Sequence, residues 1–316
     1  MDIVVVGCGA VGSLLGALLR DRGHSVSLVG RRGALADRTV RVVLPSGWMT
    51  ASGFTAPSPE RPGLTMVCLG RHHLAGIRRG QLAIPPGTGH TIFWNVDVAQ
   101  PPRLGLSRDQ WSPAVSLLSA VRLQEGDVTL AGERPALVVE RRSGAAKTLR
   151  DLGRHGFTVS EVADAVPYLD AMLVYQLLEL PAAMCGGTIP WFLSYPEGRG
   201  LATQVLVEGL KTMERAGRPL ARLPVLDPRD LLERIERRQQ SFERARELPD
   251  QAWPSLLQAF LTGRQHEARE ITKRVVEMAS DAGLSLTWNW RLFQKAGRAS
   301  SVGFYRDPVE LARAIA

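Results

Sequence analysis

The first twelve residues constrain the fold more than any other part of this chain. An apolar run from Ile3 to Val6 leads directly into a glycine-rich turn, and helix-forming residues follow it. This order is typical of a buried parallel strand that leads through a tight turn into a helix N-terminus, where backbone N–H groups attract phosphate. The pattern predicts a dinucleotide site at Gly7, Gly9, Ala10, Val11 and Gly12. The alternative is a glycine-rich turn in an unrelated α/β domain.

Each glycine of the turn has a separate expected task. Gly7 permits the tight turn, Gly9 lets the backbone approach a pyrophosphate, and Gly12 lets the helix pack closely on the strand.

The end of the second predicted strand indicates which dinucleotide is bound. The apolar run Val26 to Val29 is followed by Gly30-Arg31-Arg32. NAD-binding versions of the motif carry an acidic residue here, which accepts hydrogen bonds from the ribose hydroxyls. A guanidinium instead pairs with a phosphate that a carboxylate would repel, so the arginines favour NADP(H) over NAD(H). The alternative is that one of them, Arg32 rather than Arg31, is only a solvated charge.

The composition sets the class of protein. The chain has 316 residues, of which 45% are apolar, and a net charge of +8 at pH 7. This length allows two domains with separate cores. No run of about twenty uncharged apolar residues occurs, so we expect no membrane span. The positive charge comes almost entirely from arginines scattered along the chain, which argues against nucleic-acid binding.

The cysteines indicate a reducing compartment. Cys8, Cys68 and Cys185 are odd in number, lie in apolar or glycine-rich surroundings and form no CxxC pair. We therefore expect neither a disulfide framework nor a metal site, and a cytoplasmic protein. The strand at the N-terminus leaves no room for a signal peptide.

The hydrophobic pattern changes character once along the chain. Short apolar runs alternate with helical or loop segments up to about residue 165, and long amphipathic helices follow. The fold class is therefore α/β, a Rossmann-type doubly wound parallel sheet (residues 1–165) followed by an all-α domain (residues 166–316), with the active site expected in the cleft between them. The candidate strands are Ile3–Val6, Val26–Val29, Arg41–Leu44, Met66–Leu69, Thr91–Trp94, Val128–Leu130, Ala136–Val139 and Thr158–Val159. The candidate helices are Ala145–His155, a segment with leucines at helical spacing from Leu169 to Leu180, Gly200–Ala216, Pro228–Glu247 and Glu267–Ala282.

Three stretches together match the pattern of one family. They are the opening glycine motif with Gly30-Arg31, then Asn95 after a strand, and then Ser255-Leu-Leu-Gln followed by Gly263-Arg264 and Glu267. In these residues the chain resembles the ketopantoate reductase (2-dehydropantoate 2-reductase) family over nearly its whole length. The resemblance implies an NADP-dependent oxidoreductase acting on a small molecule, and we expect a homodimer.

The resemblance also implies roles for particular residues. Arg31 would bind the 2′-phosphate, Arg71 would supply the charge of a cofactor-contacting lysine, and Asn95 would orient the substrate or the nicotinamide. Ser255 and Glu267 would hold the polar end of a substrate. Structural alternatives stay open: Asn95 could only end a strand, Ser255 could cap a helix, and Glu267 could be an exposed residue of a first helical turn.

The main departure from the family lies at Gln176. The alignment places it where the family has its catalytic lysine, and an amide donates a hydrogen bond but no useful proton. Lys211 is the one substitute near in sequence. Other candidate proton donors are Tyr175, His266, His72 and His73. The family's Asn-Gly pair is Asn95-Val96 here.

Two functions remain open at this point. The first is a working NADPH-dependent reductase with an altered substrate, either a 2-oxo acid-like carbonyl or a cyclic imine or iminium, in which Glu267 stabilises a cation. The second is a non-catalytic NADP(H)-binding sensor or scaffold. Trp288 and Trp290 could line a pocket or pack in the core.

Overall fold

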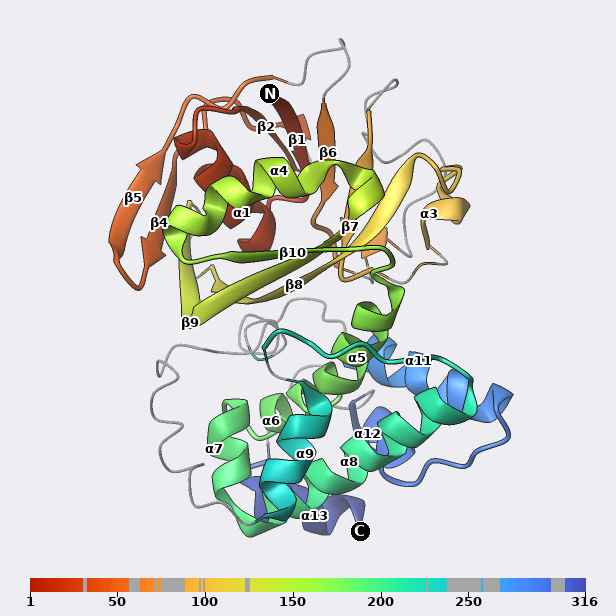
Figure 1. The fold of residues 1–316 in the computed structure, drawn as a ribbon. Coiled ribbons are helices and arrows are strands. Elements are labelled where there is room, and N and C mark those ends of the chain that lie inside the picture. The colour runs from red at the N-terminus through yellow and green to blue at the C-terminus, as the bar shows by residue number, and fades with distance from the viewer. Residues whose placement is uncertain are drawn as a thin grey trace. The chain divides into compact units, whose positions relative to one another are not determined.

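The computed structural model divides into two compact units, residues 1–169 and 170–316 (Figure 1), and each is described by itself. The residues described are 1–30, 33–56, 63–70, 73–74, 89–96, 98, 100–122, 126–225, 227–237, 257, 268–296 and 305–316. The predicted boundary after residue 165 falls four residues before the one that the packing gives.

The N-terminal unit is built on one sheet, which has ten strands in the described part of the chain. The strand order is β3-β2-β1-β6-β7-β8-β9-β4-β5, and β10 pairs with β9 off this path. The strands are β1 (Asp2–Val6), β2 (Ser25–Gly30), β3 (Gly33–Ala34), β4 (Val40–Leu44), β5 (Gly47–Ala51), β6 (Leu64–Val67), β7 (Thr91–Trp94), β8 (Trp111–Val121), β9 (Asp127–Glu140) and β10 (Thr158–Val162).

Strand β1 is buried on both faces and separates two apolar cores. Ile3 and Val5 face one core, whereas Val4 and Val6 face the other, as the two-residue period of a strand requires. Helices α1 (Ala10–Asp21) and α4 (Ala145–Leu149) cover the first of these faces (Figure 1). The 3₁₀ helices η1 (Arg141–Ser143) and η2 (Arg150–His155) flank α4, and the short helix α3 (Gln100–Arg103) follows β7.

The predicted Rossmann-type fold is confirmed, and the sheet proves to be mixed. Strands β2, β1, β6, β7 and β8 are parallel, while β8 and β9 pair antiparallel, as do β4 and β5. Strand β8 was not among the candidate strands, and it contains a proline. Pro113 is the third residue of β8 and precedes the first pair with β9, Ala114 with Val139, so its missing N–H removes no bond on that side.

Two predicted strands, Val128–Leu130 and Ala136–Val139, prove to be parts of the single strand β9. Its first half pairs with β4 (Val42 with Val128), and its second half pairs with β10 (Val138 with Ser160). Strand β9 thus holds the β4–β5 hairpin and β10 on the same sheet.

A buried carboxylate closes the end of β9. Glu140 is only 1% exposed, and its Oε2 accepts from Arg142 Nε at 2.5 Å while its Oε1 accepts from Arg108 Nη2 at 3.2 Å. The same Oε1 accepts from the backbone N–H of Ala165 at 3.2 Å. One side chain therefore joins the sheet to the segment that leaves the N-terminal unit.

Replacing Glu140 by Gln should lower the free energy of unfolding by about 2 kcal/mol, because it removes the charge from two charge-assisted hydrogen bonds at a buried site. Urea unfolding followed by circular dichroism measures the change. The matched control is Glu161→Gln, since Glu161 makes a single ion pair with the exposed Arg150 at 2.6 Å and should lose less than about 1 kcal/mol. Equal losses in the two variants would contradict the role given to Glu140.

The regular structure in the described part of the C-terminal unit is all helical, as predicted. Helix α5 (Val166–Gln176) spans the boundary between the units. The other helices are α6 (Glu179–Met184), α7 (Ile189–Ser194), α8 (Pro196–Arg215), α9 (Pro228–Glu236), α11 (Ala268–Asp281), α12 (Trp288–Ala296) and α13 (Pro308–Ile315). Within the described ranges, none of the helices has the length and apolar character needed to cross a bilayer. The predicted helices Pro228–Glu247 and Glu267–Ala282 extend into residues outside the described ones.

The leucine-rich segment from Leu169 to Leu180 is two helices rather than one. Helix α5 ends at Gln176 and α6 begins at Glu179. Pro181 explains the break, because it lacks an N–H and its ring clashes with the carbonyl of the residue four positions earlier, Leu177.

Two sets of polar contacts connect segments of this unit that are distant in sequence. Arg218 donates to both carboxylate oxygens of Asp170, from Nε and from Nη2, each at 2.8 Å. Glu208 accepts from the backbone N–H groups of Thr287, Trp288 and Asn289 at 2.7, 3.0 and 2.9 Å, and thereby caps the start of α12.

The two tryptophans at the start of α12 have different surroundings. Trp290 is 43% exposed and contacts Phe293, so core packing is wrong for it. Trp288 is half-buried beside the guanidinium of Arg291.

Candidate functional site

The glycine-rich turn joins the end of β1 to the start of α1. Gly7 adopts a φ of +103°, and a Cβ at this position would lie 2.6 Å from the carbonyl oxygen of Cys68. Any side chain here is therefore excluded both by the backbone conformation and by the neighbouring strand.

The two later glycines of the turn differ sharply in their surroundings. A Cβ on Gly12 would lie 1.9 Å from the carbonyl oxygen of Gly7, so α1 reaches the turn only because Gly12 has no side chain. A Cβ on Gly9 would meet nothing within 4 Å. Gly12 is therefore required for the packing of α1 against the turn. The packing of the fold does not require a glycine at position 9.

The start of α1 has the properties of an anion site. Gly9 is the N-cap and has no side chain to cap the helix, and the first turn holds no acidic residue. The first backbone hydrogen bond of the helix is donated by the N–H of Ser13 to the Gly9 carbonyl oxygen, at 3.0 Å. The N–H groups of Ala10, Val11 and Gly12 precede it at the positive end of the helix dipole. The space beside Gly9 and these donors fit a dinucleotide pyrophosphate.

The difference between the two glycines predicts opposite effects on the free protein. Gly12→Ala should lower the free energy of unfolding by about 2–3 kcal/mol, because the added methyl group overlaps the Gly7 carbonyl. Gly9→Ala should leave stability within about 0.5 kcal/mol of wild type, since its backbone has an ordinary φ of −71° and its methyl group enters open space. Thermal unfolding without ligand measures both. A Gly9→Ala variant as unstable as Gly12→Ala would contradict this division.

Several predicted site residues lie outside the described part of the chain. They are Arg31, Arg71, Ser255 and Glu267, together with the candidate proton donors His72 and His266. His73 is described and exposed. The roles given to these residues stay predictions.

Asn95 follows β7 and makes a specific contact with β8. It has a left-handed backbone with φ +53°, and its Nδ2 donates to Ser116 Oγ at 2.8 Å. Its Oδ1 accepts from the Ser116 N–H at 2.9 Å. The side chain therefore continues the pairing of two strands, which accounts for an asparagine at this position on structural grounds. Val96 is buried in the second apolar core.

Gln176 differs from Asn95 because its amide oxygen has no hydrogen-bond partner among the described residues. The residue is the last of α5 and is only 8% exposed, and its Oε1 is buried without a hydrogen-bond partner among the described residues. Its neighbour Tyr175 is buried as well. Burial, and then the nearby carboxylate of Glu179, raise the pKa of the Tyr175 hydroxyl above its ordinary value, which makes it a poorer proton donor.

Lys211 does not lie on the face of α8 that packs against the end of α5. A Cβ on Gly209 of α8 would lie 2.7 Å from Leu177, so this face of α8 packs against the end of α5. Lys211 follows two residues later, about 200° around the helix, and is exposed. Lys273 is exposed too and lies 3.6 Å from Glu277. Lys211 is therefore a poor substitute for the missing lysine.

Two arginines that the sequence did not single out lie at the glycine-rich turn. Arg122, just after β8, donates from Nη1 to the carbonyl oxygen of Cys8. Burial raises the pKa of the Cys8 thiol, and the charges of Arg38 and Arg122 oppose that rise. Both guanidinium groups thus act on the turn. No local signal identifies them, because each comes from a distant strand or loop.

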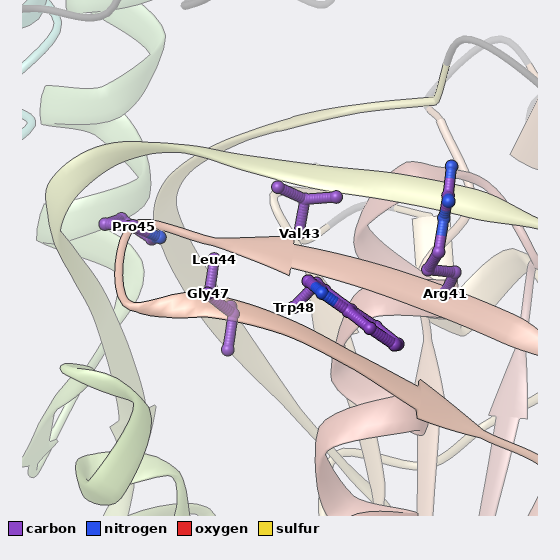
Figure 2. Close-up of a pocket in the computed structure, with 6 residues that line it drawn as sticks. All are labelled: Arg41, Val43, Leu44, Pro45, Gly47 and Trp48. Carbon is purple, nitrogen blue, oxygen red and sulfur yellow. The ribbon is translucent and has the colours of Figure 1, made fainter.

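The structure also has a hollow that is separate from the turn (Figure 2). It has a volume of about 420 Å³ on the β4–β5 hairpin, where Trp48 is 73% exposed. It is lined by Arg41, Val43, Leu44, Pro45, Gly47 and Trp48. Among the described residues, no cluster of three or more His, Cys, Asp or Glu side chains suits a metal ion.

The sheet, the turn and the helical unit together define a Rossmann-type protein with a helical C-terminal unit. The family model described as "Ketopantoate reductase PanE/ApbA" matches residues 3–69, and the model of the C-terminal part of the same family matches residues 170–298. These matches cover more than half of the chain, which therefore belongs to the ketopantoate reductase family. A search of curated proteins found no match to this chain.

Solved structures show the same fold at low sequence identity. The 2-dehydropantoate 2-reductase from Geobacter metallireducens GS-15 has a TM-score of 0.75 and 18% identity, covering 94% of this chain and 100% of that one. D-mandelate dehydrogenase with NADH and anilino(oxo)acetate has a TM-score of 0.73 and 14% identity, covering 95% and 98%. The dimeric ketopantoate reductase from Staphylococcus aureus has a TM-score of 0.70 and 14% identity, covering 95% and 99%.

Proposed function

We propose that the chain is an NADPH-dependent reductase of the ketopantoate reductase family with an altered substrate. The observation that carries the cofactor assignment is the turn from Gly7 to Gly12, with open space at Gly9 beside the uncapped start of α1. Family membership supports the same conclusion, as does the structural neighbour D-mandelate dehydrogenase, which was solved with NADH. When bound, the dinucleotide supplies the hydride.

Gln176 supports a changed substrate. A carbonyl that accepts hydride also needs a proton on its oxygen, and an amide cannot supply one. An iminium carbon accepts hydride and its nitrogen becomes a neutral amine, so no further proton is needed. Its protonated nitrogen can also donate a hydrogen bond to an acceptor such as the Gln176 Oε1, which is buried and unpartnered in the described structure. We therefore favour a cyclic imine or iminium over a 2-oxo acid-like carbonyl.

Substrate-side residues favour an enzyme over a sensor. Asn95, Ser255 and Glu267 match the family's residues at their aligned positions, and Glu267 would stabilise a cationic substrate. A non-catalytic NADP(H)-binding sensor or scaffold would need only the nucleotide half of this set. We further propose a cytoplasmic homodimer; the Staphylococcus aureus relative is described as dimeric.

The cofactor assignment predicts that Gly9→Ala weakens NADPH binding at least tenfold, because its methyl group enters the space next to the helix N–H groups. Isothermal titration calorimetry with NADPH measures the change in Kd. Gly23→Ala is not a suitable control because Gly23 has a φ of +81°, whereas Gly200→Ala is, since a Cβ there also meets nothing within 4 Å and the position lies in α8. Unchanged NADPH affinity in Gly9→Ala would argue against a pyrophosphate at this turn.

The reaction is tested with NADPH and a panel of 2-oxo acids, including ketopantoate, and cyclic imines and iminium compounds. We expect turnover of imines or iminium compounds with weak or absent ketopantoate reduction. Gln176→Leu should lower kcat/KM at least tenfold with the NADPH Kd unchanged, and Gln176→Lys should raise the rate with ketopantoate. The control is Lys211→Gln, which should behave as wild type.

Three outcomes would contradict parts of this proposal. Ketopantoate reduction at a rate typical of working reductases would contradict the proposal that the substrate is altered. A large loss of activity in Lys211→Gln would return the proton-donor role to a lysine. Tight NADPH binding without turnover across the panel would favour the sensor.

A further inference from the structure

The turn at residues 35–38 lies over the carboxyl end of β2. The backbone N–H of Leu35 donates to the Leu28 carbonyl at 2.9 Å, and that of Arg38 donates to the Leu35 carbonyl at 3.3 Å. A Cβ on Gly30, the last residue of β2, would lie 3.4 Å from Leu35 Cδ1 and 3.9 Å from Cys8 Sγ. Arg38 thus belongs to the segment that packs where β2 and the glycine-rich turn meet.

One edge of the Arg38 guanidinium, formed by Nε and Nη2, is buried. Its Nε and Nη2 atoms are buried, and neither has a hydrogen-bond partner in the part of the chain that the structure describes. Arg218 shows what this edge does elsewhere in the same molecule, where Nε and Nη2 hold the two oxygens of Asp170 at 2.8 Å each. Buried donors without acceptors are unfavourable, so the geometry calls for an oxyanion with two acceptor oxygens.

The electrostatics at this point also suit an anion. The charge of Arg38 reaches the Cys8 thiol, as does that of Arg122, which donates to the Cys8 carbonyl. The first turn of α1 adds its N–H groups and no acidic side chain. Two cations and a helix dipole therefore favour negative charge at the glycine-rich turn.

We propose that Arg38 binds the 2′-phosphate of NADP(H) through its Nε and Nη2 edge and so contributes to the preference for NADP(H) over NAD(H). This inference rests on the proposed dinucleotide function. In a Rossmann fold the pyrophosphate lies at the start of the first helix, whereas the adenosine ribose lies at the end of the second strand. The turn that carries Arg38 packs at that second position through Leu35, so the nearest phosphate is the one on the ribose.

The test compares binding of NADPH and NADH by wild type, Arg38→Gln and Arg38→Lys. We expect the NADPH Kd of Arg38→Gln to rise at least tenfold while the NADH Kd changes less than about twofold, because only NADPH has the 2′-phosphate. Arg38→Lys keeps the charge but loses the two-donor edge, so its NADPH Kd should lie between the other two. The control is Arg150→Gln, an exposed arginine paired with Glu161, which should bind both dinucleotides as wild type does.

Thermal unfolding without ligand shows whether a weaker NADPH affinity of Arg38→Gln comes from lost binding or from lost stability. Since the Nε and Nη2 atoms of Arg38 have no partner among the described residues, Arg38→Gln should unfold at the wild-type temperature or above it and should lose only the stabilisation that NADPH provides. A weakening of NADPH and NADH by the same factor would overturn the inference, and so would a preference for NADPH over NADH in Arg38→Gln as large as that of wild type. If the preference for NADPH is unchanged in Arg38→Gln, the proposed dinucleotide function is still supported. A wild-type chain that binds neither dinucleotide would overturn both.

Discussion

The N-terminal unit depends on one backbone contact, the approach of Gly12 to the carbonyl of Gly7. Because neither residue has a side chain, α1 can begin directly against the turn that leaves β1. The same close packing continues one turn later, where a Cβ on Gly16 would lie 2.6 Å from Leu28 of β2. The helix is therefore held against two strands at once, and its N–H groups are fixed in direction before any ligand arrives. A site formed by backbone in this way needs no side-chain chemistry of its own.

The fold was predictable from the sequence where the hydrophobic pattern of a segment matches its burial in the structure. The run Ile3–Val6, the glycine-rich turn and the second strand belong to this group, because a strand buried on both faces must be apolar throughout. The prediction was incomplete elsewhere. Strand β8 was not among the candidate strands, and the leucine spacing predicted helix through a segment where α5 ends and α6 begins. Arg38 could not be found from sequence, since its importance comes from residues packed around it rather than from its neighbours in the chain.

Two amides illustrate why a residue's identity gives only part of its role. Asn95 and Gln176 both stand at positions where the family alignment suggests chemistry. In the structure both ends of the Asn95 amide are bonded to Ser116, so its geometry is fixed and its hydrogen-bonding capacity is largely used. Gln176 keeps a buried carbonyl oxygen without a partner among the described residues. A buried polar group in that condition costs stability, which makes it the better candidate for contact with something outside the fold.

The central position of β9 has a consequence for the order in which the chain can fold. Strand β4 is made early in synthesis, yet its parallel partner begins 86 residues later, where Arg41 meets Asp127. Until β9 has left the ribosome, the β4–β5 hairpin lacks its parallel neighbour and β8 lacks its antiparallel one. Contacts this distant in sequence form slowly because a long loop must close first. The nascent N-terminal unit therefore exposes unpaired strand edges, with Trp48 beside one of them, for as long as synthesis takes to reach Glu140.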